Sequence, residues 1–149
     1  MADVVEIDLP SDPRSAALAR QELEPLRQSV SETRFGDIRL LVSELVAEAI
    51  RGLRNGRERK IRVSAEREGD RVRASVREGG GAYFLSSTRP EPGGVGWGPY
   101  LVARLSDSWG LRRHRESATV WFEISSEAVR APEFGEAGDR SEGPKRLDA

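Results

Sequence analysis

The sequence predicts an α+β domain in which a mostly antiparallel sheet is covered on one face by about three helices, a two-layer α/β sandwich. The first reason is a long segment, residues 37–55, whose apolar residues recur at the spacing of one buried helical face. The second is a pair of segments, residues 61–76 and 109–124, in which apolar and polar residues alternate on both sides of a turn. The two hairpins supply most of the sheet, and the helices supply the layer that covers it.

The 149-residue chain has the composition of one globular domain with a highly charged surface. We assign residues 1–126 to this domain. We expect residues 127–149 to form a disordered tail, because they lack periodicity and are rich in glycine, proline and mixed charges. The 24 basic and 25 acidic residues nearly cancel, which gives no electrostatic reason to expect nucleic acid or a membrane as a partner.

The chain contains no cysteine, so disulfides, thiolate metal sites and cysteine nucleophiles are excluded. No apolar run is long enough to span a membrane, and residues 1–10 carry acidic groups where a secretory signal would carry basic ones. These features predict a cytoplasmic protein.

The N-terminal region predicts a strand followed by a helix. Ser11 or Asp12 could cap a helix whose first position is Pro13 and which runs to about Val30. Before it, apolar residues alternate with polar ones up to Pro10, at Val5, Ile7 and Leu9.

The helical region is expected to contain an interruption and a joint. Pro25 removes a backbone hydrogen bond and costs about 3 kcal/mol inside a helix, so a kink or an early end is expected near Glu24. We interpret residues 31–36 as a joint that leads into the central helix, residues 37–55. That helix should end at Asn55, since an Asn-Gly pair suits a left-handed cap.

The central helix carries two carboxylates at the border of its apolar face. Glu44 and Glu48 stand one turn apart there, with Arg51 on the same border and Gly52 beside it. One interpretation is a solvated helix flank. The other is part of a nucleotide site, which would require a glycine-rich phosphate loop elsewhere. The apolar face comprises Ile38, Leu41, Val42, Leu45, Val46, Ala49, Ile50 and Leu53.

Two glycine clusters are candidates for such a loop. Residues 78–82 follow the first hairpin, and three successive glycines mark either a tight turn or a close approach to a ligand. Residues 93–98 lead into a helix at residues 99–105, whose first N–H groups and dipole suit a phosphate. Either cluster could equally be a structural turn. His114, in an arginine-rich segment near the last turn, is interpreted as a solvated strand end.

Three segments in this order, LVSELVAEAIRGL, VREGGGAYF and GWGPYLVARLSDSWG followed by ATVWFEI, resemble the small anti-sigma-factor serine-kinase-like proteins of bacteria. These proteins belong to the GHKL (Bergerat-fold) ATPase superfamily, which also contains gyrases and histidine kinases. The resemblance runs from about Val4 to Ile124. It implies the sandwich fold, a site for ATP or ADP with Mg²⁺, and transcription regulation through protein partners.

The resemblance implies roles for the two carboxylates of the central helix. The family's long helix carries a glutamate that acts as general base and, four residues later, an asparagine that binds the Mg²⁺ on ATP. Glu44 matches the glutamate and is the candidate catalytic residue. Glu48 occupies the asparagine position and is the candidate Mg²⁺ ligand, because Mg²⁺ favours hard oxygen ligands. Gly52 stands where the family often has a histidine.

The two glycine boxes imply the nucleotide contacts. The first box usually reads Asp-x-Gly-x-Gly, and its aspartate accepts a hydrogen bond from the adenine amino group. Here a glutamate replaces the aspartate and an alanine replaces the last glycine. The second box, Gly-x-Gly-Leu, appears as Gly-Trp-Gly-Pro and keeps both glycines. The candidate nucleotide-binding residues are therefore Glu78, Gly80, Ala82, Gly94, Gly96, Trp97 and Gly98.

These departures predict a nucleotide site that is weakened or lost. Without a metal, Glu48 repels the triphosphate. One charge pair at about 5 Å with an effective dielectric near 20 is worth roughly 3 kcal/mol, about a hundredfold in affinity. Glu78 is one methylene longer than aspartate, so it displaces the backbone or loses the adenine contact. Trp97 could fill part of the pocket or stack on a base.

Three functional hypotheses follow. The leading one is a bacterial regulator that binds a sigma factor or an STAS-type antagonist protein and has a weakened or lost ATP site. The alternative is an active ATP- and Mg²⁺-dependent serine protein kinase that phosphorylates an anti-sigma-factor antagonist. The third is a generic α+β domain whose glycines are simply turns. A homodimer formed through the strand at residues 5–9 is a further hypothesis.

Overall fold

The five strands form one sheet in which every neighbouring pair is antiparallel, in the order β1-β2-β3-β5-β4. The computed structural model describes residues 4–52, 60–79, 97–115 and 117–127. The strands are β1 (Val4–Leu9), β2 (Ile61–Glu68), β3 (Arg71–Glu78), β4 (Ser108–Arg113) and β5 (Ala118–Ser125).

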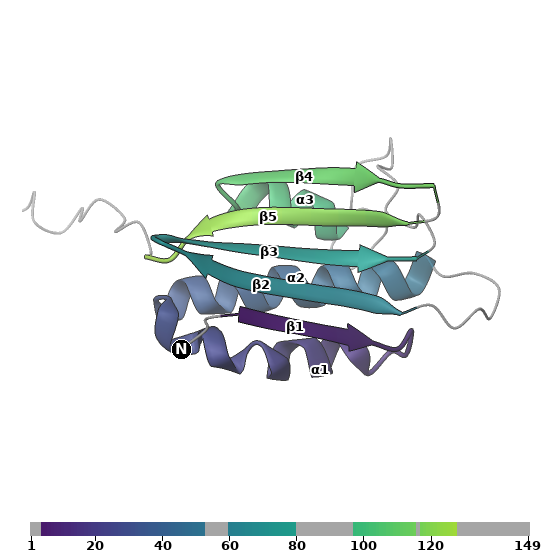
Figure 1. Cartoon of the computed structure of the whole chain (residues 1–149), viewed down its shortest axis with the longest axis horizontal. Coiled ribbons are helices and arrows are strands. Elements are labelled where there is room, and N and C mark those ends of the chain that lie inside the picture. The colour runs from purple at the N-terminus through teal and green to yellow at the C-terminus, as the bar shows by residue number, and fades with distance from the viewer. Residues whose placement is uncertain (1–3, 53–59, 80–96, 116, 128–149) are drawn as a thin grey trace, which may run out of the picture.

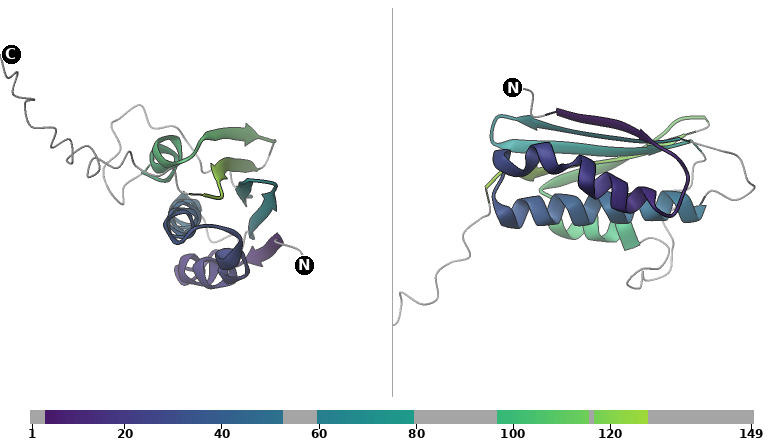
Figure 2. Two further views of the ribbon diagram at one scale, coloured as in Figure 1. Left: turned by 90° about the vertical axis from the view of Figure 1, so that its left-hand side faces the viewer. Right: turned by 90° about the horizontal axis from the view of Figure 1, so that it is seen from below.

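The helices cover one face of this sheet and leave the other face uncovered (Figures 1 and 2). They are α1 (Ser15–Glu22), the 3₁₀-helix η1 (Glu24–Ser29), α2 (Glu32–Gly52) and α3 (Trp97–Leu105). The core lies between the two layers, where the apolar stripe of α2 packs against the inward residues of the strands. The predicted α+β sandwich is confirmed. No helix in the described ranges is long and apolar enough to cross a membrane.

The N-terminal elements follow the sequence prediction with one shift. The first helix ends at Glu22 and continues as η1, so the early end expected near Glu24 is confirmed. Its start is two residues later than predicted, because Asp12 Oδ1 accepts the N–H of Arg14 at 2.8 Å and holds this segment in a turn. The Ser15 hydroxyl then donates to the Pro10 carbonyl at 2.6 Å and anchors α1 to the end of β1.

The joint predicted at residues 31–36 is wrong, because α2 begins at Glu32. Ser31 caps the helix: its Oγ accepts the N–H of Arg34 at 3.2 Å, and its carbonyl accepts the N–H of Phe35 at 2.8 Å. Phe35 is only 1% exposed and adds a large apolar side chain to the core. The predicted end of this helix at Asn55 lies outside the described residues.

Both predicted hairpins are confirmed. The β2–β3 turn contains Gly69, whose φ of 61° lies in the left-handed region that favours glycine. In β5, every second residue is buried from Ala118 to Ile124, as the alternation predicted. This alternation gives the sheet an apolar inner face and a polar outer face.

Candidate nucleotide site

The predicted site residues of α2 lie where this helix borders α3. Glu44 is half-buried and Glu48, one turn later, is only 3% exposed. The apolar stripe of α2 packs on the sheet, so its border carries these two carboxylates toward α3 rather than into the core. The C-terminal part of α2 and the end of β3 lie at the same end of the sandwich (Figure 1).

Glu48 binds the start of α3 directly. Its Oε2 accepts a hydrogen bond from the backbone N–H of Gly98 at 2.9 Å. Gly98 is the second residue of α3, so its N–H is one of the first donors that a helix cannot satisfy internally. The positive end of the helix dipole also favours an anion here. The carboxylate therefore occupies the kind of position in which a helix N-terminus binds a phosphate.

Gly98 is required by the close packing of the two helices. A Cβ at this position would lie 2.8 Å from Glu48 Oε2, 3.2 Å from Leu45 Cδ2 and 3.4 Å from the Glu44 carbonyl oxygen. The structure thus brings Glu44, Glu48 and Gly98 together, which the resemblance implied. Leu45, which the sequence analysis placed only in the core, also packs against Gly98. Its position in the apolar stripe, next to Glu44, is the only sequence signal for that role.

Glu78 ends β3 and is completely buried. It pairs with Ala118 in the β3–β5 ladder, and Gly79 follows it in a turn. Glu48 and Glu78 each have a further interaction within the chain. Both carboxylates are therefore part of the packed protein. The predicted contact of Glu78 with adenine stays a prediction.

Trp97, the first residue of α3, stacks on Tyr100, with ring centroids 5.4 Å apart and an interplanar angle of 23°. Tyr100 is 38% exposed and the guanidinium of Arg104 lies 5.8 Å from its ring centroid. One face of the Trp97 ring is thus used within the helix. Its predicted stacking on a base remains a prediction. Four other predicted contacts, Gly80, Ala82, Gly94 and Gly96, lie outside the described residues.

The family model of the histidine kinase-like ATPase domain matches residues 9–124. The chain belongs to this family. A solved structure with the same fold contains the RsbU and RsbW domains of Rv1364c from Mycobacterium tuberculosis, with a TM-score of 0.65 and 22% sequence identity. The similarity covers 82% of this chain and 32% of the solved chain, so this chain spans about a third of the solved chain's length. No curated protein matches significantly.

A histidine kinase-like ATPase domain implies ATP with Mg²⁺, and the contact between Glu48 and Gly98 tests how well the described residues fit these ligands. A phosphate at the start of α3 would meet a carboxylate that already accepts the N–H of Gly98. This arrangement fits a phosphate poorly. Within the described ranges, no group of three acidic or histidine side chains could hold a metal ion. The role of Glu48 as a Mg²⁺ ligand therefore stays a prediction.

The Gly98→Ala substitution should destabilise this histidine kinase-like ATPase domain by about 1–3 kcal/mol, because the new methyl group overpacks the boundary between α2 and α3. The added Cβ would lie too close to Glu48 Oε2 and Leu45 Cδ2. Urea unfolding followed by circular dichroism measures the change. In a Glu48→Ala background the loss should shrink by at least about 0.5 kcal/mol, because the nearest atom is gone.

Gly36→Ala is the matched control. Gly36 lies inside α2, and a Cβ there meets nothing within 4 Å. This substitution should stabilise the domain by about 0.5–1 kcal/mol, since alanine loses less backbone entropy than glycine in a helix. Equal shifts in the same direction for both alanine variants would contradict the packing argument at Gly98.

Proposed function

We propose that this protein is a bacterial regulator that acts by protein–protein binding and has a weakened or lost ATP site. The observation that carries the proposal is the hydrogen bond from the Gly98 N–H to Glu48 Oε2. It places a nearly fully buried negative charge at the start of α3, where the family's fold would receive the phosphates. Repulsion at about 5 Å is worth roughly 3 kcal/mol at an effective dielectric near 20.

The partner of this regulator is a sigma factor or an STAS-type antagonist protein, and its compartment is the cytoplasm. Two findings support the choice of partner. The motif segments resemble the bacterial anti-sigma-factor serine kinases. The solved structure of similar fold contains an RsbW domain. A domain that has lost nucleotide affinity can keep such a role when its partner binds a surface separate from the phosphate site.

A homodimer formed through β1 extends this proposal. β1 is an edge strand of the sheet and pairs only with β2 among the described strands. Edge strands present unpaired N–H and C=O groups to a second chain. Val4, at the start of this strand, is 45% exposed and would be covered in such a pair.

The alternative function is an ATP- and Mg²⁺-dependent serine protein kinase. One observation favours it: Glu44 is half-buried beside Glu48 and the start of α3, so a substrate could reach its carboxylate. Glu44 would then act as the catalytic base and Glu48 as the Mg²⁺ ligand. This function requires nucleotide affinity to rise when Mg²⁺ is added.

Isothermal titration with ATP and with ADP, each with and without Mg²⁺, distinguishes the two functions. We expect dissociation constants of about 1 mM or weaker, and less than about a threefold effect of Mg²⁺. A folded protein, verified by circular dichroism, is the required control. Tight binding that depends on Mg²⁺ would overturn the proposed function and favour the kinase. Phosphoryl transfer by the Glu44→Ala variant would then be the next measurement.

A further inference from the structure

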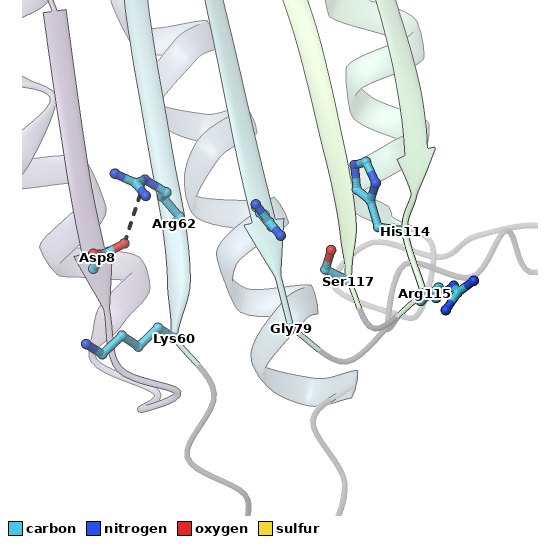
Figure 3. Close-up of a pocket in the computed structure, with 8 residues that line it drawn as sticks. Asp8, Lys60, Arg62, Gly79, His114, Arg115 and Ser117 are labelled. Carbon is cyan, nitrogen blue, oxygen red and sulfur yellow. Dashed lines mark ion pairs between the residues drawn. The ribbon is translucent and has the colours of Figure 1, made fainter.

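A basic hollow of about 860 Å³ lies at the end of the sheet where β2 begins and β3 ends. The hollow lies on the outer face of the sheet. Side chains along a strand point alternately to the two faces, and the strand neighbours of the lining residues point into the core. Figure 3 shows the lining side chains at the ends of neighbouring strands, around Gly79. The charged and titratable side chains of the lining are Asp8, Lys60, Arg62, Arg77, His114 and Arg115.

The charges in this hollow are not balanced. Four permanent cations face one carboxylate, although the whole chain is nearly neutral. Arg62 is partly neutralised, since its guanidinium lies 2.7 Å from Glu6 and 3.9 Å from Asp8. Lys60 and Arg77 form no ion pair with any residue that the structure describes. Counting only the residues that the structure describes, the hollow therefore carries an excess of positive charge.

The register of β2 and β3 makes this imbalance specific to the hollow. Arg62 and Arg77 are directly opposite each other, and like charges in such a pair destabilise a sheet. Elsewhere on the outer face of the same two strands, the charged pairs have opposite signs: Glu66 faces Arg73 and Glu68 faces Arg71. Only the pair at the hollow departs from this rule. An anionic ligand would supply the missing negative charge.

We propose that this hollow binds a short acidic segment of a partner protein. Arginine binds carboxylates with two parallel hydrogen bonds, so Arg77 is suited to an aspartate or glutamate side chain. From β2 to β4 the hollow spans three inter-strand steps, β2 to β3, β3 to β5 and β5 to β4. At about 4.8 Å per step this is about 14 Å, the length of about four extended residues.

The surroundings of the hollow favour a short acidic segment over a nucleic acid. Beyond the lining carboxylate Asp8, the carboxylate of Glu6 stands on β1, and those of Glu66 and Glu68 stand further along β2. A phosphate backbone that extends beyond the hollow would meet these negative charges, whereas a segment of about four residues would not. The hollow and the contact between Glu48 and Gly98 lie on opposite faces of the sheet. This inference is therefore independent of the proposed loss of ATP binding.

A fluorescein-labelled hexaglutamate peptide is the probe, and fluorescence anisotropy is the measurement. The full-length protein should bind it at about 20 mM salt and bind it more weakly at about 150 mM, because salt screens exposed charges. The Lys60→Gln/Arg77→Gln variant should bind it about tenfold more weakly. The matched control Arg20→Gln/Arg67→Gln, which removes two exposed cations outside the hollow, should change binding by less than about twofold.

A stability measurement separates binding from folding. Arg77→Gln relieves the repulsion with Arg62, so the variant should resist urea as well as the parent protein or better, while binding the peptide less. Equal losses of binding in the test and control variants would overturn the proposal. So would the absence of peptide binding at low salt, or tighter binding of a labelled six-nucleotide oligothymidine than of hexaglutamate.

Discussion

The Glu48→Gln variant is expected to bind ATP about a hundredfold more tightly than the parent protein. Glutamine has the same length and keeps a side-chain oxygen that can accept the Gly98 N–H, which Glu48 Oε2 accepts at 2.9 Å. The substitution therefore removes the negative charge with little change in geometry. The positive dipole end of α3 can then attract the phosphates without an opposing carboxylate. Isothermal titration without metal measures the gain.

Two further variants separate electrostatic repulsion from metal binding. Glu22→Gln, on the exposed surface of α1, removes the same charge away from the site and should change ATP affinity by less than about twofold. Glu48→Asn, which introduces the asparagine that the resemblance implies at this position, should gain affinity in the same direction. If Glu48 instead holds Mg²⁺, Glu48→Gln will weaken the binding of Mg²⁺-ATP while Glu48→Asn retains it, and repulsion by Glu48 is then not what limits nucleotide affinity.

The elements that the sequence predicted correctly are those whose signals are local. The alternation in β2, β3 and β5 requires only that one face of each strand is buried, and both hairpins followed from it. The interruption of the first helix followed from the backbone chemistry of Pro25. The error at residues 31–36 has a physical cause. Gly36 has low helix propensity, but the cap at Ser31 and the burial of Phe35 outweigh it.

The candidate site required information that lies far apart in the sequence. Glu48 and Gly98 were each singled out, but their hydrogen bond joins residues 50 positions apart, and no periodicity predicts it. The basic hollow was missed for a similar reason. Arg62 and Arg77 become neighbours only through the register of β2 and β3. His114 was interpreted as a solvated strand end, and it is exposed, as expected.

The Phe35→Ala variant is expected to lose about 3–5 kcal/mol of stability, the largest loss we predict for a single substitution in this domain. Phe35 is 1% exposed and ranks among the largest fully buried side chains. Its ring also lies under two guanidinium groups, with Arg27 at 4.5 Å and Arg39 at 5.5 Å from the centroid. The substitution removes both the packing and these contacts. Urea unfolding of the two proteins under identical conditions gives the difference.

The size of this loss also tests where α2 begins. If residues 31–36 formed a loose joint, truncating an aromatic side chain there would cost about 1 kcal/mol or less. The matched control is Leu40→Ala on the same helix. Leu40 is 41% exposed, so its truncation should cost less than about 1 kcal/mol. Similar losses of stability at positions 35 and 40 would mean that the first turn of α2 does not pack against the core. A large loss at position 35 alone would mean that the capped start of the helix holds the core together.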